Sequence, residues 1–142
     1  MKKYLTLILA LPFLLCCSKE EIRNNNPYLP NYSFSFPIDI SFPTYNDLRY
    51  PSAPVVITGA GAGINGIIVM YTGNGYVAFE NTCPNHDVRP CSILQRNGIL
   101  TKCTCDDIEY SLYDGSPTTQ TRFPLKAYRV EVLNSTNIRV YN

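Results

Sequence analysis

Apolar and polar side chains alternate strictly between residues 32 and 42. The apolar positions are Tyr32, Phe34, Phe36, Ile38, Ile40 and Phe42. A period of two predicts a β-strand that buries one face. Pro37 lies on the other face and lacks a backbone N–H, so the strand is expected at the edge of a sheet.

Shorter apolar runs separated by turn residues predict the other strands. One short strand is expected at Val55–Ile57, and the runs on either side of the glycine-rich turn 72–75 predict a hairpin. Asn97-Gly98 predicts a second hairpin over residues 92–102. A last hairpin places Tyr128, Val130 and Val132 opposite Ile138 and Val140. Together these elements predict an all-β domain.

Length and composition restrict the classes of function. A chain of 142 residues holds one small domain, and its 12 basic and 11 acidic residues offer no basic surface for nucleic acid. The glycine-rich stretch 59–63 is followed by a β-rich run instead of a helix, which excludes a dinucleotide-binding loop. His86 is the only histidine, and no acid–base pair is recognisable by spacing, so we expect no enzyme.

The N-terminus is typical of a lipoprotein signal peptide. Two lysines precede the apolar run 4–15, which is too short to span a bilayer as a helix. The run ends in Leu14-Leu15-Cys16-Cys17, which resembles the lipobox of bacterial lipoproteins. This resemblance implies that residues 1–16 are removed and that Cys17 carries the lipid. A plain secreted protein and an uncleaved anchor are the alternatives.

The residues that follow Cys17 predict a spacer and a location. Residues 17–30 are polar and rich in turn formers, so we expect a lipid-anchored flexible linker ahead of a domain over residues 31–142. Ser18-Lys19-Glu20-Glu21 resembles the charged tether by which some Bacteroidetes lipoproteins reach the cell surface, and the start of a solvated linker is the alternative. The chain is therefore expected outside the inner membrane, held to the outer membrane on its periplasmic or its cell-surface face.

The four cysteines outside this leader lie in one stretch of the chain. It opens with Cys83-Pro84-Asn85-His86, contains Cys91 and closes with Cys103-Thr104-Cys105-Asp106-Asp107. The predicted hairpin 92–102 lies between the two cysteine loops and is expected to bring them face to face. Four cysteines allow three pairings, and the sequence alone does not choose among them.

The order of these elements resembles the Rieske iron–sulfur domain. A glycine-rich hairpin runs into a Cys-Pro loop, and then come a second hairpin, a Cys-x-Cys loop with Tyr110 after it, an Asp-Gly turn, Pro124-Leu125 and a Val-x-Val strand. The resemblance covers residues 55–141. It implies an antiparallel β-sandwich with a small subdomain of two opposed loops, each of which supplies one cysteine and one histidine to a 2Fe-2S cluster.

The resemblance assigns a role to each cysteine of the two loops. Cys83 and Cys103 match the cysteines that bind the cluster. Cys91 and Cys105 match a pair that forms a disulfide between the loops in the subgroup similar to cytochrome bc complex proteins. The disulfide pairing of this chain is thus implied by the family geometry.

The histidine positions depart from the family pattern. Asn85 stands where the first loop has a histidine, and His86 comes one residue later. Asp106 replaces the second histidine, and Asp107 stands where a glycine lets backbone N–H groups approach the cluster. An aspartate ligand would make a cluster more negative and lower in potential than a typical Rieske centre.

Four uses of these residues follow. We expect two disulfides, Cys83–Cys103 and Cys91–Cys105, in a degenerate domain without a cofactor that acts as a structural or binding module. The main alternative is an electron-transfer protein with an atypical 2Fe-2S cluster on Cys83, His86, Cys103 and Asp106. The others are thiol redox chemistry and a zinc site formed by Cys83, His86, Cys103 and Cys105.

The predicted route of export favours the disulfides. The leader has no Arg-Arg pair, so it gives no sign of export in the folded state with a cluster already inserted. Thiols outside the inner membrane meet an oxidising environment. The sequence identifies the membrane as a partner through the lipid anchor, but it does not identify a redox or surface protein partner.

Overall fold

The computed structural model describes residues 25–142. The predicted signal peptide, lipidation at Cys17 and the linker up to residue 24 lie outside the described residues. The strands are β1 (Ser35–Asp39), β2 (Val55–Ile57), β3 (Ile67–Tyr71), β4 (Tyr76–Glu80), β5 (Gln95–Asn97), β6 (Leu100–Lys102), β7 (Glu109–Ser111), β8 (Ala127–Val132) and β9 (Asn137–Tyr141). Two short 3-10 helices are η1 (Pro43–Arg49) and η2 (Pro90–Ser92). No helix within the described range has the length and apolar character to cross a membrane.

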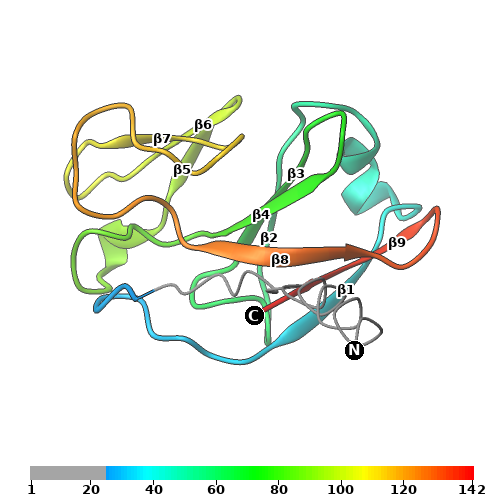
Figure 1. The fold of residues 1–142 in the computed structure, drawn as a ribbon, viewed down its shortest axis with the longest axis horizontal. Coiled ribbons are helices and arrows are strands. Elements are labelled where there is room, and N and C mark those ends of the chain that lie inside the picture. Colours follow the sequence, from blue (N-terminus) through cyan, green and yellow to red (C-terminus); the bar gives the residue numbers. More distant parts are fainter. Residues whose placement is uncertain (1–24) are drawn as a thin grey trace, which may run out of the picture.

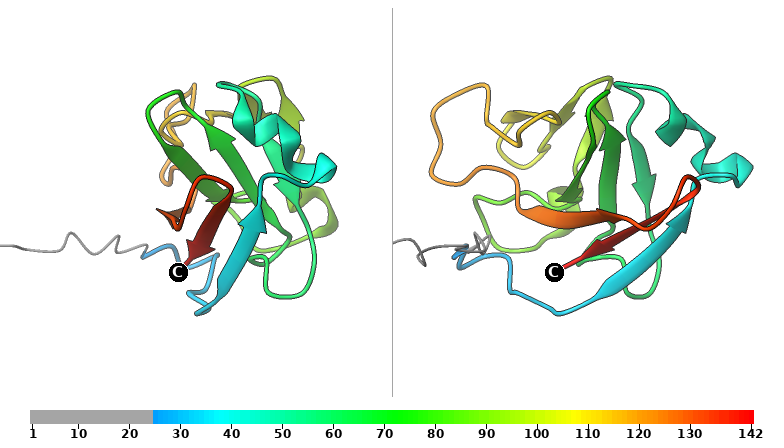
Figure 2. Two further views of the ribbon diagram at one scale, coloured as in Figure 1. Left: turned by 90° about the vertical axis from the view of Figure 1, so that its right-hand side faces the viewer. Right: turned by 45° about the vertical axis from the view of Figure 1, so that its right-hand side comes forward.

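The strands form two antiparallel sheets. The larger has the order β1-β9-β8-β4-β3-β2, and the smaller has the order β5-β6-β7. Figure 1 shows the small sheet at one end of the molecule, and Figure 2 shows the large sheet curling around its core. The all-β class, the edge position of β1 and the three predicted hairpins are confirmed.

The large sheet consists of two halves that join at a narrow contact. The half formed by β1, β9 and β8 meets the half formed by β4, β3 and β2 only where Ala78 pairs with Tyr128 and Phe79 pairs with Ala127. The inner faces of both halves enclose one hydrophobic cluster, which contains Ile38, Ile57, Ile67, Val69, Ile138 and Val140. A second cluster lies under the cysteine loops and contains Ile68, Met70, Leu94, Leu112 and Leu125.

The first strand is shorter than the alternating pattern predicts. Pairing with β9 covers only Ser35–Asp39. Ile38 is buried in the core, whereas Tyr32 and Phe42 are 60% and 57% exposed. The alternation holds for one residue beyond the paired segment at each end, since Ile40 is buried and Phe34 packs against the core, and it fails at Tyr32 and Phe42.

The segment before β1 belongs to the folded domain. Leu29 is fully buried, and the side-chain amide of Asn26 donates a 2.7 Å hydrogen bond to the carbonyl oxygen of Pro84. The Nζ of Lys126, itself buried, donates to the carbonyl oxygen of Pro30 at 2.6 Å. This contradicts the flexible linker predicted up to residue 30, because an apolar side chain and a buried ammonium group both hold the segment on the domain.

A buried carboxylate fixes the chain that enters the first cysteine loop. Glu80 is fully buried at the end of β4. Its Oε2 accepts hydrogen bonds from the backbone N–H of Ile64 (2.8 Å) and the hydroxyl of Tyr128 (2.6 Å). Its Oε1 accepts from the N–H of Asn65 (3.1 Å) and the hydroxyl of Thr82 (2.7 Å). Burial, together with the Glu80 charge, raises the pKa of Tyr128, so this hydroxyl stays protonated and remains a donor.

The glycine-rich stretch 59–63 wraps this carboxylate. Gly63 has a φ of 67°, and a Cβ atom there would lie 2.5 Å from the Oε2 of Glu80. Only glycine has both the conformational freedom and the small size that the position requires. The stretch therefore supports the loop that follows β4, and the predicted absence of a helix after it is confirmed.

Candidate functional site

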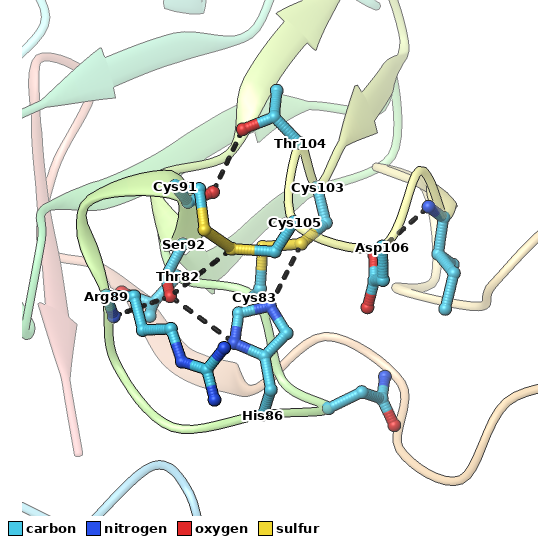
Figure 3. The surroundings of a disulfide bond; sticks show 12 residues. Thr82, Cys83, His86, Arg89, Cys91, Ser92, Cys103, Thr104, Cys105 and Asp106 are labelled. Atoms are coloured by element: carbon cyan, nitrogen blue, oxygen red, sulfur yellow. Dashed lines mark hydrogen bonds between the residues drawn. A yellow bond between two sulfur atoms is a disulfide. The ribbon is translucent and has the colours of Figure 1, made fainter.

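Two loops, one after β4 and one after β6, form the candidate site (Figure 3). In the first, the backbone N–H of Cys83 donates to the carbonyl oxygen of Ser92 at 2.8 Å. In the second, the N–H of Cys103 donates to the carbonyl oxygen of Ile108 at 2.9 Å. Each loop is thus closed by a backbone hydrogen bond at its first cysteine, and the hairpin β5-β6 places the two loops against each other.

Two disulfides join the loops. Cys83 pairs with Cys103 and Cys91 pairs with Cys105, with Cα–Cα distances of 5.6 and 5.2 Å. Both pairings are those that the resemblance implied. Cys83 and Cys103 have 0% exposure, whereas Cys91 is exposed. We call Cys83–Cys103 the inner disulfide, which belongs to the core, and Cys91–Cys105 the outer disulfide, which lies at the surface.

The difference in burial predicts an order of reduction. A dithiol must reach a sulfur atom to attack it, so under native conditions the outer disulfide is expected to open before the inner one. Alkylation of the thiols after increasing times of reduction, followed by mass analysis of peptides, measures this order. Labelling of Cys83 and Cys103 ahead of Cys91 would show that the inner pair is the more accessible.

His86 lies directly over the inner disulfide. Its Nε2 is 3.3 Å from the Sγ of Cys103, and its Nδ1 is 2.9 Å from the backbone carbonyl oxygen of Asp87. A carbonyl oxygen only accepts hydrogen bonds, so Nδ1 is the donor to Asp87. In this tautomer of an uncharged ring, Nε2 carries no proton and presents its lone pair toward the sulfur of Cys103. Figure 3 shows the ring directed at the sulfur atoms. The ligand atoms of Cys83, His86 and Cys103 all lie within 4.8 Å of one another.

The two aspartates of the second loop have other partners. Asp106 Oδ1 accepts a 3.1 Å hydrogen bond from the N–H of Ile108, and Asp106 lies outside the group formed by the cysteines and His86. Asp107 has a φ of 61° and forms a 2.9 Å ion pair with Lys102. Its carboxylate raises the pKa of Lys102. The predicted ligand set is therefore brought together at three positions but not at Asp106.

Asn85 holds the first loop to a distant part of the chain. Its Nδ2 donates to the hydroxyl of Tyr110 at 2.8 Å and to the carbonyl oxygen of Phe123 at 2.9 Å. Its Oδ1 accepts from the N–H of Phe123 at 2.9 Å. Asn85, which stands at the family's histidine position, thus joins the first loop to the segment before β8 through hydrogen bonds. Sequence reasoning noted its position but missed this role.

The buried tyrosine beneath Asn85 makes stability depend on alkaline pH. Burial raises the pKa of Tyr110 to about 12 from the ordinary value of 10.0. A raised pKa means that the unfolded chain loses this proton first, so the stabilisation is complete below pH 10 and disappears as the pH rises toward 12. The free energy of unfolding is expected to fall by up to about 1.4 kcal/mol per pH unit from this group. Denaturant titrations at several pH values measure the slope, and an unchanged slope in Tyr110→Phe would contradict the assignment.

With both disulfides formed, the described residues do not fit a 2Fe-2S cluster. The Rieske cluster needs four protein ligands, whereas only Cys83, His86 and Cys103 converge, and their two sulfur atoms are bonded to each other. The predicted zinc set is not assembled either, because the sulfur of Cys105 is bonded to that of Cys91.

Comparisons with known proteins give likenesses of fold. No family model and no curated protein matches the chain. One similar solved structure is described as an NADH-dependent nitrite reductase small subunit from Mycobacterium tuberculosis, with 18% identity, a TM-score of 0.47 and coverage of 79% of this chain and 97% of that one. The ferredoxin of carbazole 1,9a-dioxygenase from Nocardioides aromaticivorans IC177 has 21% identity, a TM-score of 0.41 and coverage of 64% and 86%.

A third neighbour is an oxygenase and ferredoxin complex of carbazole 1,9a-dioxygenase, with 16% identity and a TM-score of 0.49. The match covers 76% of this chain and 28% of that one. These similarities are similarities of backbone fold. None of them assigns an activity to the present chain. The antiparallel all-β architecture and the two opposed cysteine loops predicted from the sequence are confirmed by the sheet order and by the disulfides that join the loops.

Proposed function

We propose that this chain is a lipid-anchored binding module with a Rieske-like fold, in which disulfides have replaced the cluster and Cys17 carries the lipid. The observation that carries the proposal is the inner disulfide, which joins the two sulfur atoms that would otherwise hold one iron. A disulfide uses both thiolates. The loops therefore gain a covalent link and lose two ligands.

The residues at the two histidine positions support this proposal independently. Asn85 makes three hydrogen bonds to Tyr110 and Phe123, and Asp106 is bonded to the backbone of its own loop. A metal at either position would compete with bonds that hold the loops in shape. Both positions have acquired structural roles in place of ligation.

The surface beside the outer disulfide is the part that we propose contacts a protein partner. Val88 and Ile93 are 45% and 47% exposed and lie on either side of Cys91 in the sequence. Apolar side chains on loops held by a disulfide lose little conformational entropy when they bind. With the lipid at Cys17, such a partner is a periplasmic or cell-surface protein.

Electron transfer through an atypical 2Fe-2S centre is the second candidate. The observation that favours it is the convergence of the ligand atoms of Cys83, His86 and Cys103. This function requires that the inner disulfide is open and that the carboxylate of Asp106 leaves the N–H of Ile108 to become the fourth ligand.

Anaerobic reconstitution with iron and sulfide separates the two candidates. The reduced full chain is compared with Asp106→His, which restores the family's residue, and with Asp107→His as a control at the neighbouring exposed position. We expect no stoichiometric iron–sulfide chromophore in any of the three. One cluster per chain in the unmodified protein, or a cluster that appears with Asp106→His and not with Asp107→His, would establish the electron-transfer candidate instead.

A further inference from the structure

We propose that reduction of the inner disulfide turns the loop tips into a site for a single soft divalent metal ion, with Zn²⁺ as the test ion. The ligands are the Sγ atoms of Cys83 and Cys103 and the Nε2 of His86. The site exists only in the reduced protein, because the oxidised sulfur atoms are bonded to each other. The disulfide thus controls metal binding.

The distances between the ligand atoms suit one tetrahedral ion. With Zn–S bonds of about 2.3 Å and Zn–N bonds of about 2.0 Å, neighbouring sulfur and nitrogen ligands lie about 3.5 Å apart. The Nε2 of His86 is already 3.3 Å from the Sγ of Cys103, and all three ligand atoms lie within 4.8 Å. After reduction, the two sulfur atoms have to move apart, because they are no longer bonded to each other.

The imidazole is held in the orientation that a metal ligand needs. Its Nδ1 proton is directed to the carbonyl oxygen of Asp87 at 2.9 Å, and the hydroxyl of Ser92 lies 3.5 Å from the same nitrogen. Histidines that bind metals commonly donate the other ring N–H to a backbone carbonyl or a carboxylate, which fixes the tautomer. The lone pair of Nε2 is thereby directed at the sulfur atoms.

Three protein ligands match one ion and leave its fourth position to solvent. His86 is only partly buried, so water can reach that position. Asp106 is bonded elsewhere and does not complete the set. This geometry is that of an open zinc site, and it differs from the four-ligand, two-iron arrangement implied by the family.

The step that creates the site balances with a dithiol as the reductant. The dithiol gives two electrons and two protons, becomes a disulfide itself, and leaves Cys83 and Cys103 as thiols. Binding of Zn²⁺ then releases these two protons, because zinc is held by thiolates. The inference rests on the proposed function, since it takes the sulfur atoms of the resting protein to be oxidised and not bound to a cluster.

The test uses the exported chain, in which residues 1–16 are expected to be removed and Cys17 to be lipidated, with Cys91→Ser and Cys105→Ser, so that only the inner pair supplies thiols. The protein is reduced with a water-soluble phosphine, and Zn²⁺ affinity is measured by competition with a coloured chelator. Co²⁺ reports thiolate ligation through its charge-transfer absorption. We expect one ion per reduced chain, none in the oxidised chain, and an affinity lowered at least about tenfold by His86→Ala. Asp107→Ala, which removes an exposed carboxylate from the same loop, is the matched control and is expected to leave the affinity unchanged.

Three results would overturn the proposal. One is a reduced chain that binds no more Zn²⁺ than the oxidised chain. Another is an affinity that does not change in His86→Ala. The third is a reduced chain whose near-ultraviolet circular dichroism is lost and is not restored by one equivalent of Zn²⁺. Iron and acid-labile sulfide in the protein as purified would instead contradict the proposed function. Failure of the zinc proposal can therefore be told apart from failure of the proposed function.

Discussion

Replacing Glu80 with alanine is expected to lower the free energy of unfolding by about 3–5 kcal/mol. The carboxylate accepts four hydrogen bonds inside the domain. Its removal leaves the buried hydroxyls of Thr82 and Tyr128 without this acceptor, and it also takes the acceptor from two half-buried backbone N–H groups. Each buried donor without a partner costs about 1–3 kcal/mol, and water that enters the new cavity recovers part of the loss. Denaturant unfolding followed by circular dichroism measures the change.

A second acidic residue provides the control for Glu80. Glu131 pairs with Arg139 on the surface, and Glu131→Ala is expected to change the free energy of unfolding by less than about 1 kcal/mol. Glu80→Gln keeps the shape and one acceptor, so it should fall between the two variants. If Glu80→Ala were no more destabilising than Glu131→Ala, the buried carboxylate would have no structural role.

Removal of the inner disulfide is the other change with a large expected effect. The variant with Cys83→Ala and Cys103→Ala is expected to be less stable by about 3–5 kcal/mol. The disulfide closes a loop with a sequence separation of 20 residues, and opening it raises the entropy of the unfolded chain. Both sulfur atoms also fill space in the core cluster under the loops, so their loss leaves a cavity.

The outer disulfide allows the entropic and packing contributions to be separated. Its sequence separation of 14 residues gives a similar loop-closure effect, but Cys91 is exposed and Cys105 is only half-buried at the edge of the core cluster, so less packing is lost than with the inner pair. We therefore expect Cys91→Ser with Cys105→Ser to cost about 2–3 kcal/mol, less than the inner pair. The loops overlap, so the two effects should not be additive. An outer pair that costs more than the inner pair would contradict the assignment of Cys83 and Cys103 to the core.

Local pattern was enough to predict the strands and hairpins. Turn chemistry at Asn97-Gly98 and period-two alternation around Ile38 depend on neighbours in the sequence, and these elements were found where expected. The disulfide pairing needed the family resemblance, because three pairings are compatible with the sequence. Helix η1 was not predicted, since Pro43–Arg49 carries no clear apolar period.

The interactions that sequence reasoning missed join residues far apart in the chain. Asn85 binds the backbone at Phe123, and Lys126 binds the carbonyl oxygen of Pro30. Neither partner is suggested by the local sequence, because both depend on how the sheets bring segments together. Similarly, Asp106 resembled a ligand by its position in the loop, but the short distance to Ile108 N–H lets it close its own turn.

The intact mass and visible absorption of the chain, purified from an exported preparation without reducing agent, test the disulfide-locked module most directly. A colourless protein that is four hydrogen atoms lighter than the fully reduced chain is expected, which corresponds to the inner and outer disulfides. A brown protein that contains iron and sulfide in equal amounts, with Cys83 and Cys103 free of a disulfide, would contradict the proposal and make electron transfer the function of this domain.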